Sequence, residues 1–206
     1  QFPEGPIAMP DGTVLLVDIK RGCLTRVAPG GEKEVVAEIG GGPNGAAIGP
    51  DGKVYICNSG GFEWSEVDGL TVPGDEPAYY TEGLIQRVDA GTGRVEIVYR
   101  QCGENPLKGP NDIVFDADGG FWFTDLGKMR RRDMDRGGLY YALPDGSEIR
   151  EVVYPLFTPN GVGLSPDGKR IYVAETMTAR VYFWDIVGPG EVKQELTPNG
   201  GQLLAT

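Results

Sequence analysis

The sequence predicts an all-β protein built as a β-propeller, and three observations support this prediction. Gly and Pro contribute 33 and 16 of the 206 residues, which indicates many turns between short strands. One hairpin pattern occurs four times along the chain. The copies are spaced as in propellers, whose four-stranded blades repeat about every 40–50 residues. The alternative fold is a β-sandwich in which the hairpins resemble one another by chance.

Each copy of the pattern opens with a polar residue that follows a proline. We call these polar residues the anchors; they are Glu4, Asn44, Asn111 and Asn160. A short apolar run follows each anchor and turns at an Asp-Gly pair, which favours a β-hairpin because Gly tolerates positive φ. The turn glycines are Gly12, Gly52, Gly119 and Gly168. A second apolar run then ends at a polar residue, which is Asp18, Asn58, Asp125 or Glu175.

Further strands are expected after the hairpins, at residues 138–142, 149–153, 181–185 and 192–196, which gives about four strands per unit. The second interval between anchors is the longest because it contains an insertion near residues 59–83. This insertion is either a lid over the channel or a surface loop. The charged segment 127–137 is expected to be a solvated loop.

Residues 1–206 are predicted to form a single propeller domain. Four blades make the smallest propeller that is at all common, and an open ring of blades would expose sheet edges. We therefore expect the four blades to be part of a larger ring. The remaining blades would come from the natural chain or from a second chain.

Composition excludes several classes of protein. The formal net charge of −11 disfavours binding to nucleic acid and to anionic membranes. The chain has no histidine, which excludes a Ser-His-Asp triad and any histidine-ligated metal. Cys23, Cys57 and Cys102 fit no metal or disulfide spacing and are expected to be small core residues. No apolar run is long enough for a membrane span, and a cytoplasmic location is expected.

The anchors predict a metal site. The innermost strand of every blade lines the channel of a propeller, so equivalent residues on successive blades converge at one end of it. One carboxylate and three amide oxygens form a hard-oxygen site that suits Ca²⁺, with Mg²⁺ or Mn²⁺ as alternatives. Zn²⁺ is the least suited because nitrogen and sulfur ligands are missing. The competing interpretation is that the Pro-Asn-Gly segments only begin turns.

Several of these segments also resemble one known family. The segments at 3–6 (PEGP), 109–112 (GPND), 159–161 (PNG), 120–125 (GFWFTD) and 165–168 (SPDG) resemble motifs of the SMP-30/gluconolactonase/luciferin-regenerating-enzyme family. The resemblance implies a six-bladed propeller with a divalent cation in its channel. It also implies that Glu4, Asn111 and Asn160 are metal ligands. The fourth ligand, an Asp that is also the general-base candidate, is expected beyond Thr206, so the catalytic residue is unknown.

The resemblance implies a hydrolase that opens a lactone, with the cation acting as a Lewis acid on the carbonyl of a small-molecule lactone or ester. Asn44 is expected to bind the substrate or a metal-bound water. Asp125 is the second candidate for substrate binding, with a structural, salt-bridged Asp as the alternative. Two alternatives remain open. The segment 174–176 (AET) and Arg180 also resemble strictosidine-synthase-like propellers, which are not metal-dependent hydrolases. A non-catalytic propeller that serves as a binding scaffold is the other alternative.

Overall fold

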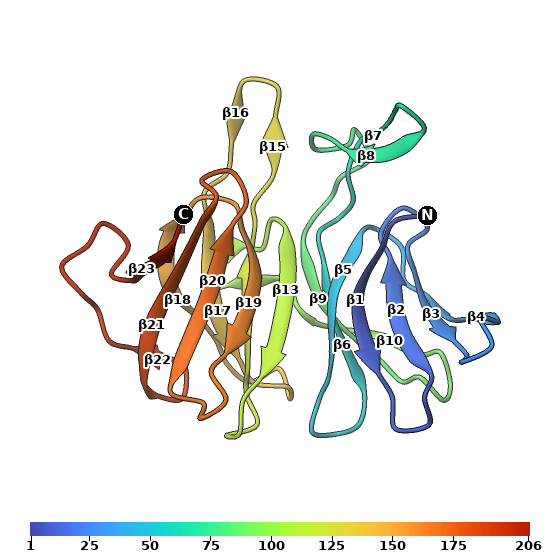
Figure 1. Ribbon diagram of the computed structural model, residues 1–206, viewed down its shortest axis with the longest axis horizontal. Helices are drawn as coiled ribbons and strands as arrows, with labels where there is room; N and C mark the ends of the chain where they lie inside the picture. Colours follow the sequence, from blue (N-terminus) through green and yellow to red (C-terminus); the bar gives the residue numbers. More distant parts are fainter.

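The computed structural model describes residues 1–206 and consists of strands and loops. Four antiparallel sheets follow one another from the N-terminus to the C-terminus (Figure 1). This arrangement confirms the predicted all-β propeller architecture. No helix of the chain has the length and apolarity needed to cross a bilayer.

Each sheet is one blade, and its first strand along the chain is the inner strand. Blade 1 consists of β1 (Pro3–Ala8), β2 (Val14–Asp18), β3 (Cys23–Val27) and β4 (Lys33–Glu38). Blade 2 consists of β5 (Pro43–Ile48), β6 (Val54–Asn58), β9 (Leu84–Val88) and β10 (Val95–Tyr99). Blade 3 consists of β13 (Pro110–Phe115), β14 (Phe121–Asp125), β17 (Gly137–Ala142) and β18 (Ile149–Leu156). Blade 4 consists of β19 (Pro159–Leu164), β20 (Arg170–Glu175), β21 (Arg180–Gly188), β22 (Glu191–Val192) and β23 (Gln202–Ala205).

The outer edge of blade 4 differs from the sequence prediction. The strand expected at 192–196 is wrong, because β22 ends at Val192 after pairing with the end of β21. The chain then forms a loop closed by a hydrogen bond from the Glu195 N–H to the Gly200 carbonyl. After this loop β23 pairs with the beginning of β21. Two short strands therefore share an edge that a single strand occupies in the other blades.

The apolar core is divided among the interfaces between blades. One buried cluster joins blades 1 and 2, a second joins blades 2 and 3, and a third joins blades 3 and 4. Cys23 and Cys57 are buried, Cys102 is partly buried, and all three are free thiols, as expected for small apolar residues. The inner strand β1 contacts β5, β5 contacts β13, and β13 contacts β19. No comparable contact joins β19 to β1, and the six-bladed ring remains a prediction.

The inner strands share an irregularity that the sequence pattern did not predict. The register between the inner strand and the second strand shifts at the anchor in all four blades, directly after Glu4 in blade 1 and across the anchor itself in the other three. Such a β-bulge bends the strand and changes the direction of a side chain. The turn glycines adopt positive φ, between 69° and 86°, as the Asp-Gly pairs predicted.

Gly45, which follows the anchor Asn44, is required by close packing between inner strands. A Cβ atom at Gly45 would lie 2.5 Å from the Asn111 carbonyl oxygen and 2.6 Å from the Asp112 Cα atom. Both are backbone atoms that move only together with β13. We expect Gly45→Ala to lower the free energy of unfolding by about 1–3 kcal/mol, as for other overpacked sites. Urea denaturation measures the change.

Gly163→Ala is the matched control for this substitution. Gly163 also lies on an inner strand, but a Cβ atom there meets nothing within 4 Å. Its free energy of unfolding should stay within about 0.5 kcal/mol of the original value. Equal effects of the two substitutions would contradict the close approach of β5 and β13.

Three small hairpins lie outside the blades. They are β7 (Trp64–Val67) with β8 (Leu70–Pro73), β11 (Gln101–Cys102) with β12 (Asn105–Pro106), and β15 (Met129–Arg130) with β16 (Asp133–Met134). The β7–β8 hairpin belongs to the insertion. In Figure 1 it projects from the upper side of the molecule, as does the β15–β16 hairpin.

The segment 127–137 is only in part the solvated loop that its charges suggested. It forms the β15–β16 hairpin, and its Lys128 is only 2% exposed. Arg130 forms ion pairs with Glu76, Asp133 and Asp135. Lys128 is therefore buried and Arg130 is paired, whereas Arg131, Arg132 and Arg136 are exposed as the sequence predicted.

Candidate functional site

A cavity of about 250 Å³ brings the four anchors together. Glu4, Asn44, Asn111 and Asn160 come from the four inner strands and line the same space. They are separated by up to 156 residues of sequence, and only the blade repeat brings them into one place. The structure thus places the three predicted metal ligands and the substrate candidate Asn44 side by side, while their roles stay predictions.

The three anchor asparagines differ in their partners. Asn44 and Asn111 are 9% and 3% exposed, and the structure gives neither side-chain amide a hydrogen bond inside the protein. Asn160 donates from Nδ2 to Thr176 Oγ1 over 3.0 Å, which leaves its Oδ1 without a protein partner. The polar atoms of these amides are open to the cavity and are therefore available to a bound molecule or to water.

Glu4 is the only acidic side chain that lines the cavity. Partial burial raises the pKa of the Glu4 carboxyl, and the Gly5 amide opposes this rise. The negative charge of Asp112 raises the pKa of Glu4 further. The cavity therefore disfavours a bare carboxylate at Glu4, and a bound cation would reverse this effect by favouring the charged form.

Asp112 is a residue near the site that the sequence reasoning did not select. It stands directly after an anchor, where the other three blades carry Gly5, Gly45 and Gly161. Its Oδ2 accepts a hydrogen bond from the Val162 N–H over 2.9 Å and so connects β13 to β19. Burial raises the pKa of this carboxyl. The departure from the Gly pattern was the available signal for a special role at this position.

Asp125 lies outside the cavity and has a role that recurs in every blade. Its Oδ1 accepts hydrogen bonds from the Gly109 and Gly127 N–H groups, and its Oδ2 accepts one from the Lys108 N–H. We call Asp18, Asn58, Asp125 and Glu175 the capping residues, because each accepts a hydrogen bond from the backbone before the proline of its inner strand. These contacts account for the burial of Asp125, and its contact with substrate remains a prediction.

The position of each capping residue explains why its side chain binds the backbone. Each of them pairs in register with the proline that precedes an anchor. Proline has no N–H group, so a ladder hydrogen bond is missing at that point. The capping side chain instead binds an N–H group one or two residues earlier. In this way it fixes the chain where the anchor leaves the regular strand.

Apolar side chains form much of the remaining wall of the cavity. Phe2, Phe62, Leu126, Met129 and Met177 all line it. Phe62, Pro73 and Gly74 come from the insertion near residues 59–83, so the insertion covers one side of the site. No Lys or Arg lines the cavity. The site therefore combines oxygen donors at the inner strands with an apolar cover and has no cationic side chain.

The donor set of the cavity consists of oxygen atoms. The structure contains no cluster of three or more His, Cys, Asp and Glu side chains. The anchors instead offer one carboxylate and three amide oxygens, which are the ligand types of Ca²⁺. The unpartnered amides of Asn44 and Asn111 are consistent with such a ligand.

Comparison with known proteins assigns the family. Residues 2–197 match the family model described as SMP-30/Gluconolactonase/LRE-like region. The chain belongs to this family. The resemblance found in the sequence motifs is thereby confirmed over nearly the whole chain.

Individual relatives agree with this assignment. Lactonase drp35 of Staphylococcus epidermidis is 28% identical over 175 residues, which cover 84% of this chain and 47% of that protein. A gluconolactonase structure from Xanthomonas campestris has a TM-score of 0.70 at 21% identity, covering 92% of this chain and 60% of that one. The calcium-binding protein regucalcin from Agrobacterium tumefaciens has a TM-score of 0.64 at 20% identity, with coverages of 96% and 60%. The chain spans about half the length of the curated relatives it matches.

Proposed function

We propose that this chain carries the cation-binding end of a lactone-hydrolysing active site. The observation that carries the proposal is the convergence of Glu4, Asn44, Asn111 and Asn160 on one cavity. Family membership and lactonase relatives support the reaction class. The calcium-binding neighbour supports a divalent cation. Ca²⁺ is the ion that the donor set favours, ahead of Mg²⁺ and Mn²⁺, with Zn²⁺ least suited.

The residues that line the cavity would have three different roles. Glu4, Asn111 and Asn160 would hold the cation, which when bound supplies Lewis-acid polarisation of the lactone carbonyl. Asn44 would orient the substrate, because its free amide can both donate and accept hydrogen bonds. The apolar cover that includes Phe62 would exclude water from one side of the substrate.

None of these cavity residues is suited to be the general base. A carboxylate that binds a dication is a poor base, so Glu4 is unsuited to take a proton from water. No other Asp or Glu lines the cavity. The expectation that an Asp beyond Thr206 supplies the base therefore remains part of the proposal.

Hydrolysis of δ-gluconolactone and of phenyl acetate tests the proposal. In the protein extended through the two blades expected beyond Thr206, which would supply the base, we expect Ca²⁺ to stimulate acid release, followed in a pH-stat, and excess EGTA to abolish it. Asn111→Ala should lower Ca²⁺ affinity, measured by calorimetry, by at least about 10-fold. Asn105→Ala removes an exposed asparagine outside the cavity and should leave the affinity unchanged. Absence of both cation binding and hydrolysis would reject the proposal in favour of a strictosidine-synthase-like enzyme or a binding scaffold.

A further inference from the structure

Lys128 is a buried cation without an ionic partner. It is 2% exposed, and no carboxylate oxygen lies within the 4.0 Å of an ion pair. Its Nζ donates a hydrogen bond of 2.6 Å to the Gly61 carbonyl oxygen. The same atom lies 4.8 Å from the ring centres of both Phe62 and Tyr80. Two aromatic rings and one carbonyl therefore surround the ammonium group.

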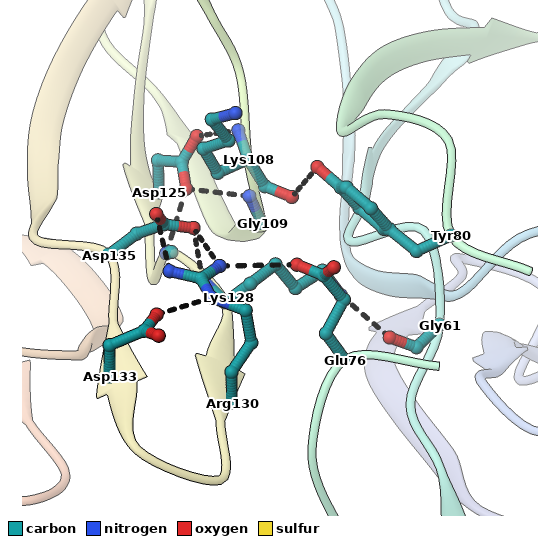
Figure 2. A network of polar contacts seen from close by, with 11 residues as sticks. Gly61, Glu76, Tyr80, Lys108, Gly109, Asp125, Lys128, Arg130, Asp133 and Asp135 are labelled. Atoms are coloured by element: carbon teal, nitrogen blue, oxygen red, sulfur yellow. Dashed lines mark hydrogen bonds and ion pairs between the residues drawn. The ribbon is translucent and has the colours of Figure 1, made fainter. Parts of the chain in front are cut away.

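This arrangement joins two parts of the chain that are distant in sequence. Gly61, Phe62 and Tyr80 belong to the insertion, whereas Lys128 directly precedes β15. Figure 2 shows Gly61, Tyr80 and Lys128. Burial of an ammonium group is costly, and a cation–π contact compensates part of the cost when the group is desolvated. The side chain is therefore held in place only as long as the insertion stays closed over it.

The cavity lies next to this contact. Phe62, which contacts Lys128, also lines the cavity. So do Leu126 and Met129, which flank Lys128 in the sequence. Lys128 thus connects two walls of the cavity, one from the insertion and one from the segment after β14.

Other contacts join the same two segments farther from Phe62. The Glu76 N–H donates to the Met129 carbonyl over 2.7 Å, and the Glu76 carboxylate pairs with Arg130 at 3.2 Å. Tyr80 joins the insertion to a third segment, before β13, because its hydroxyl donates to the Lys108 carbonyl over 2.8 Å (Figure 2). These contacts hold the far end of the insertion. Among the contacts between the two segments, the one made by Lys128 reaches residues 61 and 62.

We propose that Lys128 is a positioning residue that holds Phe62 and the Gly61 backbone in place and thereby fixes one wall of the substrate cavity. The part of this inference that concerns substrate rests on the proposed function. Lys128 itself does not line the cavity and is not expected to touch substrate. Its effect should therefore fall on KM, and kcat should change little.

The burial of Lys128 and the charges around it determine how the contact between Lys128 and the insertion depends on pH. Burial lowers the pKa of Lys128 from 10.5 to about 8, while the negative charges of Glu76, Asp125 and Asp135 oppose this shift. Arg130, the other cation nearby, is neutralised by its own carboxylate partners. An exposed lysine keeps its proton up to about pH 10.4, so opening of the contact takes up a proton above pH 8. The closed arrangement is therefore favoured progressively as the pH rises above 8.

Trp64 offers a readout that does not depend on activity. Its ring centre lies 6.1 Å from that of Phe62, and the ring is partly exposed. The other two tryptophans, Trp122 and Trp184, are 0% and 1% exposed. Acrylamide quenching of the full chain therefore reports mainly on Trp64 and on the position of the insertion.

The experiment compares the original chain with Lys128→Met and Lys128→Ala between pH 6.5 and 9.5. Quenching of the original chain should decrease above pH 8. In Lys128→Met, which keeps the bulk of the side chain but has no titrating group, this pH dependence should disappear. Lys128→Ala should be quenched more strongly at every pH. In the protein extended through the blades expected beyond Thr206, Lys128→Ala should raise the KM for δ-gluconolactone about 10-fold and change kcat less than about threefold.

Lys169→Met is the matched control, because Lys169 is exposed and lies in the turn between β19 and β20. It should keep the quenching profile of the original chain. If Lys128→Met also keeps that profile, and Lys128→Ala is quenched like the original chain, the positioning role is overturned. If the profile changes as expected but no variant hydrolyses a lactone, the proposed function fails while the role of Lys128 in holding Phe62 stands.

Discussion

Replacing Glu4 with glutamine is expected to lower the affinity of the cavity for Ca²⁺ by at least about 100-fold. Glu4 supplies the only negative charge among the side chains that line the cavity. Glutamine keeps the shape and one oxygen donor but removes the charge, and ligand charge is a main determinant of Ca²⁺ affinity. Lactone hydrolysis should fall in parallel. Titration calorimetry and the pH-stat assay measure the two effects.

The same substitution should affect stability in the opposite direction. The pKa of Glu4 is raised by partial burial and by Asp112, so the folded chain disfavours the charged form relative to the unfolded chain. A raised carboxyl pKa means that stability decreases as the pH rises through it. At neutral pH and without cation, Glu4→Gln is therefore expected to raise the melting temperature slightly. If Glu4 served only to stabilise the fold, Glu4→Gln would lower the melting temperature instead.

Glu104→Gln is the control for both measurements. Glu104 is exposed in the turn between β11 and β12, and no cavity residue lies in that turn. Its removal changes the net charge by the same amount without changing the cavity. Equal losses of Ca²⁺ affinity in the two variants would mean that general electrostatic attraction, and not coordination by Glu4, holds the cation.

The repeated units could be predicted from the sequence because each rule involved is local. An Asp-Gly pair between apolar runs specifies a hairpin within about ten residues, and Gly12, Gly52, Gly119 and Gly168 all adopt the expected positive φ. The anchors could be located because the turn glycines set their register. Their convergence in one cavity then follows from the symmetry of stacked blades.

The features that the sequence did not predict depend on contacts between distant segments. The charges around Lys128 are typical of a solvated loop, and only the insertion, more than 40 residues earlier, buries this lysine. The outer edge of blade 4 depends on a loop that returns β23 to β21. The role of Asp125 could not be read from its position at a strand end, because it depends on the missing N–H group of Pro110 in the paired strand.

Asp125→Ala is expected to be the most destabilising of the substitutions considered, with a loss of about 3–5 kcal/mol in the free energy of unfolding. The substitution leaves the Lys108, Gly109 and Gly127 N–H groups without their acceptor, in a region that is largely buried. Each buried donor without a partner costs about 1–3 kcal/mol. Urea denaturation, followed by circular dichroism, measures the loss. If the alanine variant does not fold, Asp125→Asn, which keeps one acceptor oxygen, gives a smaller loss of the same sign.

The result also decides between the two roles considered for Asp125. Asp118→Ala removes an exposed carboxylate from the Asp-Gly turn of the same blade and should change stability by less than about 0.5 kcal/mol. A structural cap predicts a large loss of stability for Asp125→Asn, with the KM of the remaining folded protein unchanged. A substrate contact predicts the reverse, a small loss of stability and a raised KM. Since all four capping residues accept backbone hydrogen bonds beside an inner-strand proline, we expect the first outcome.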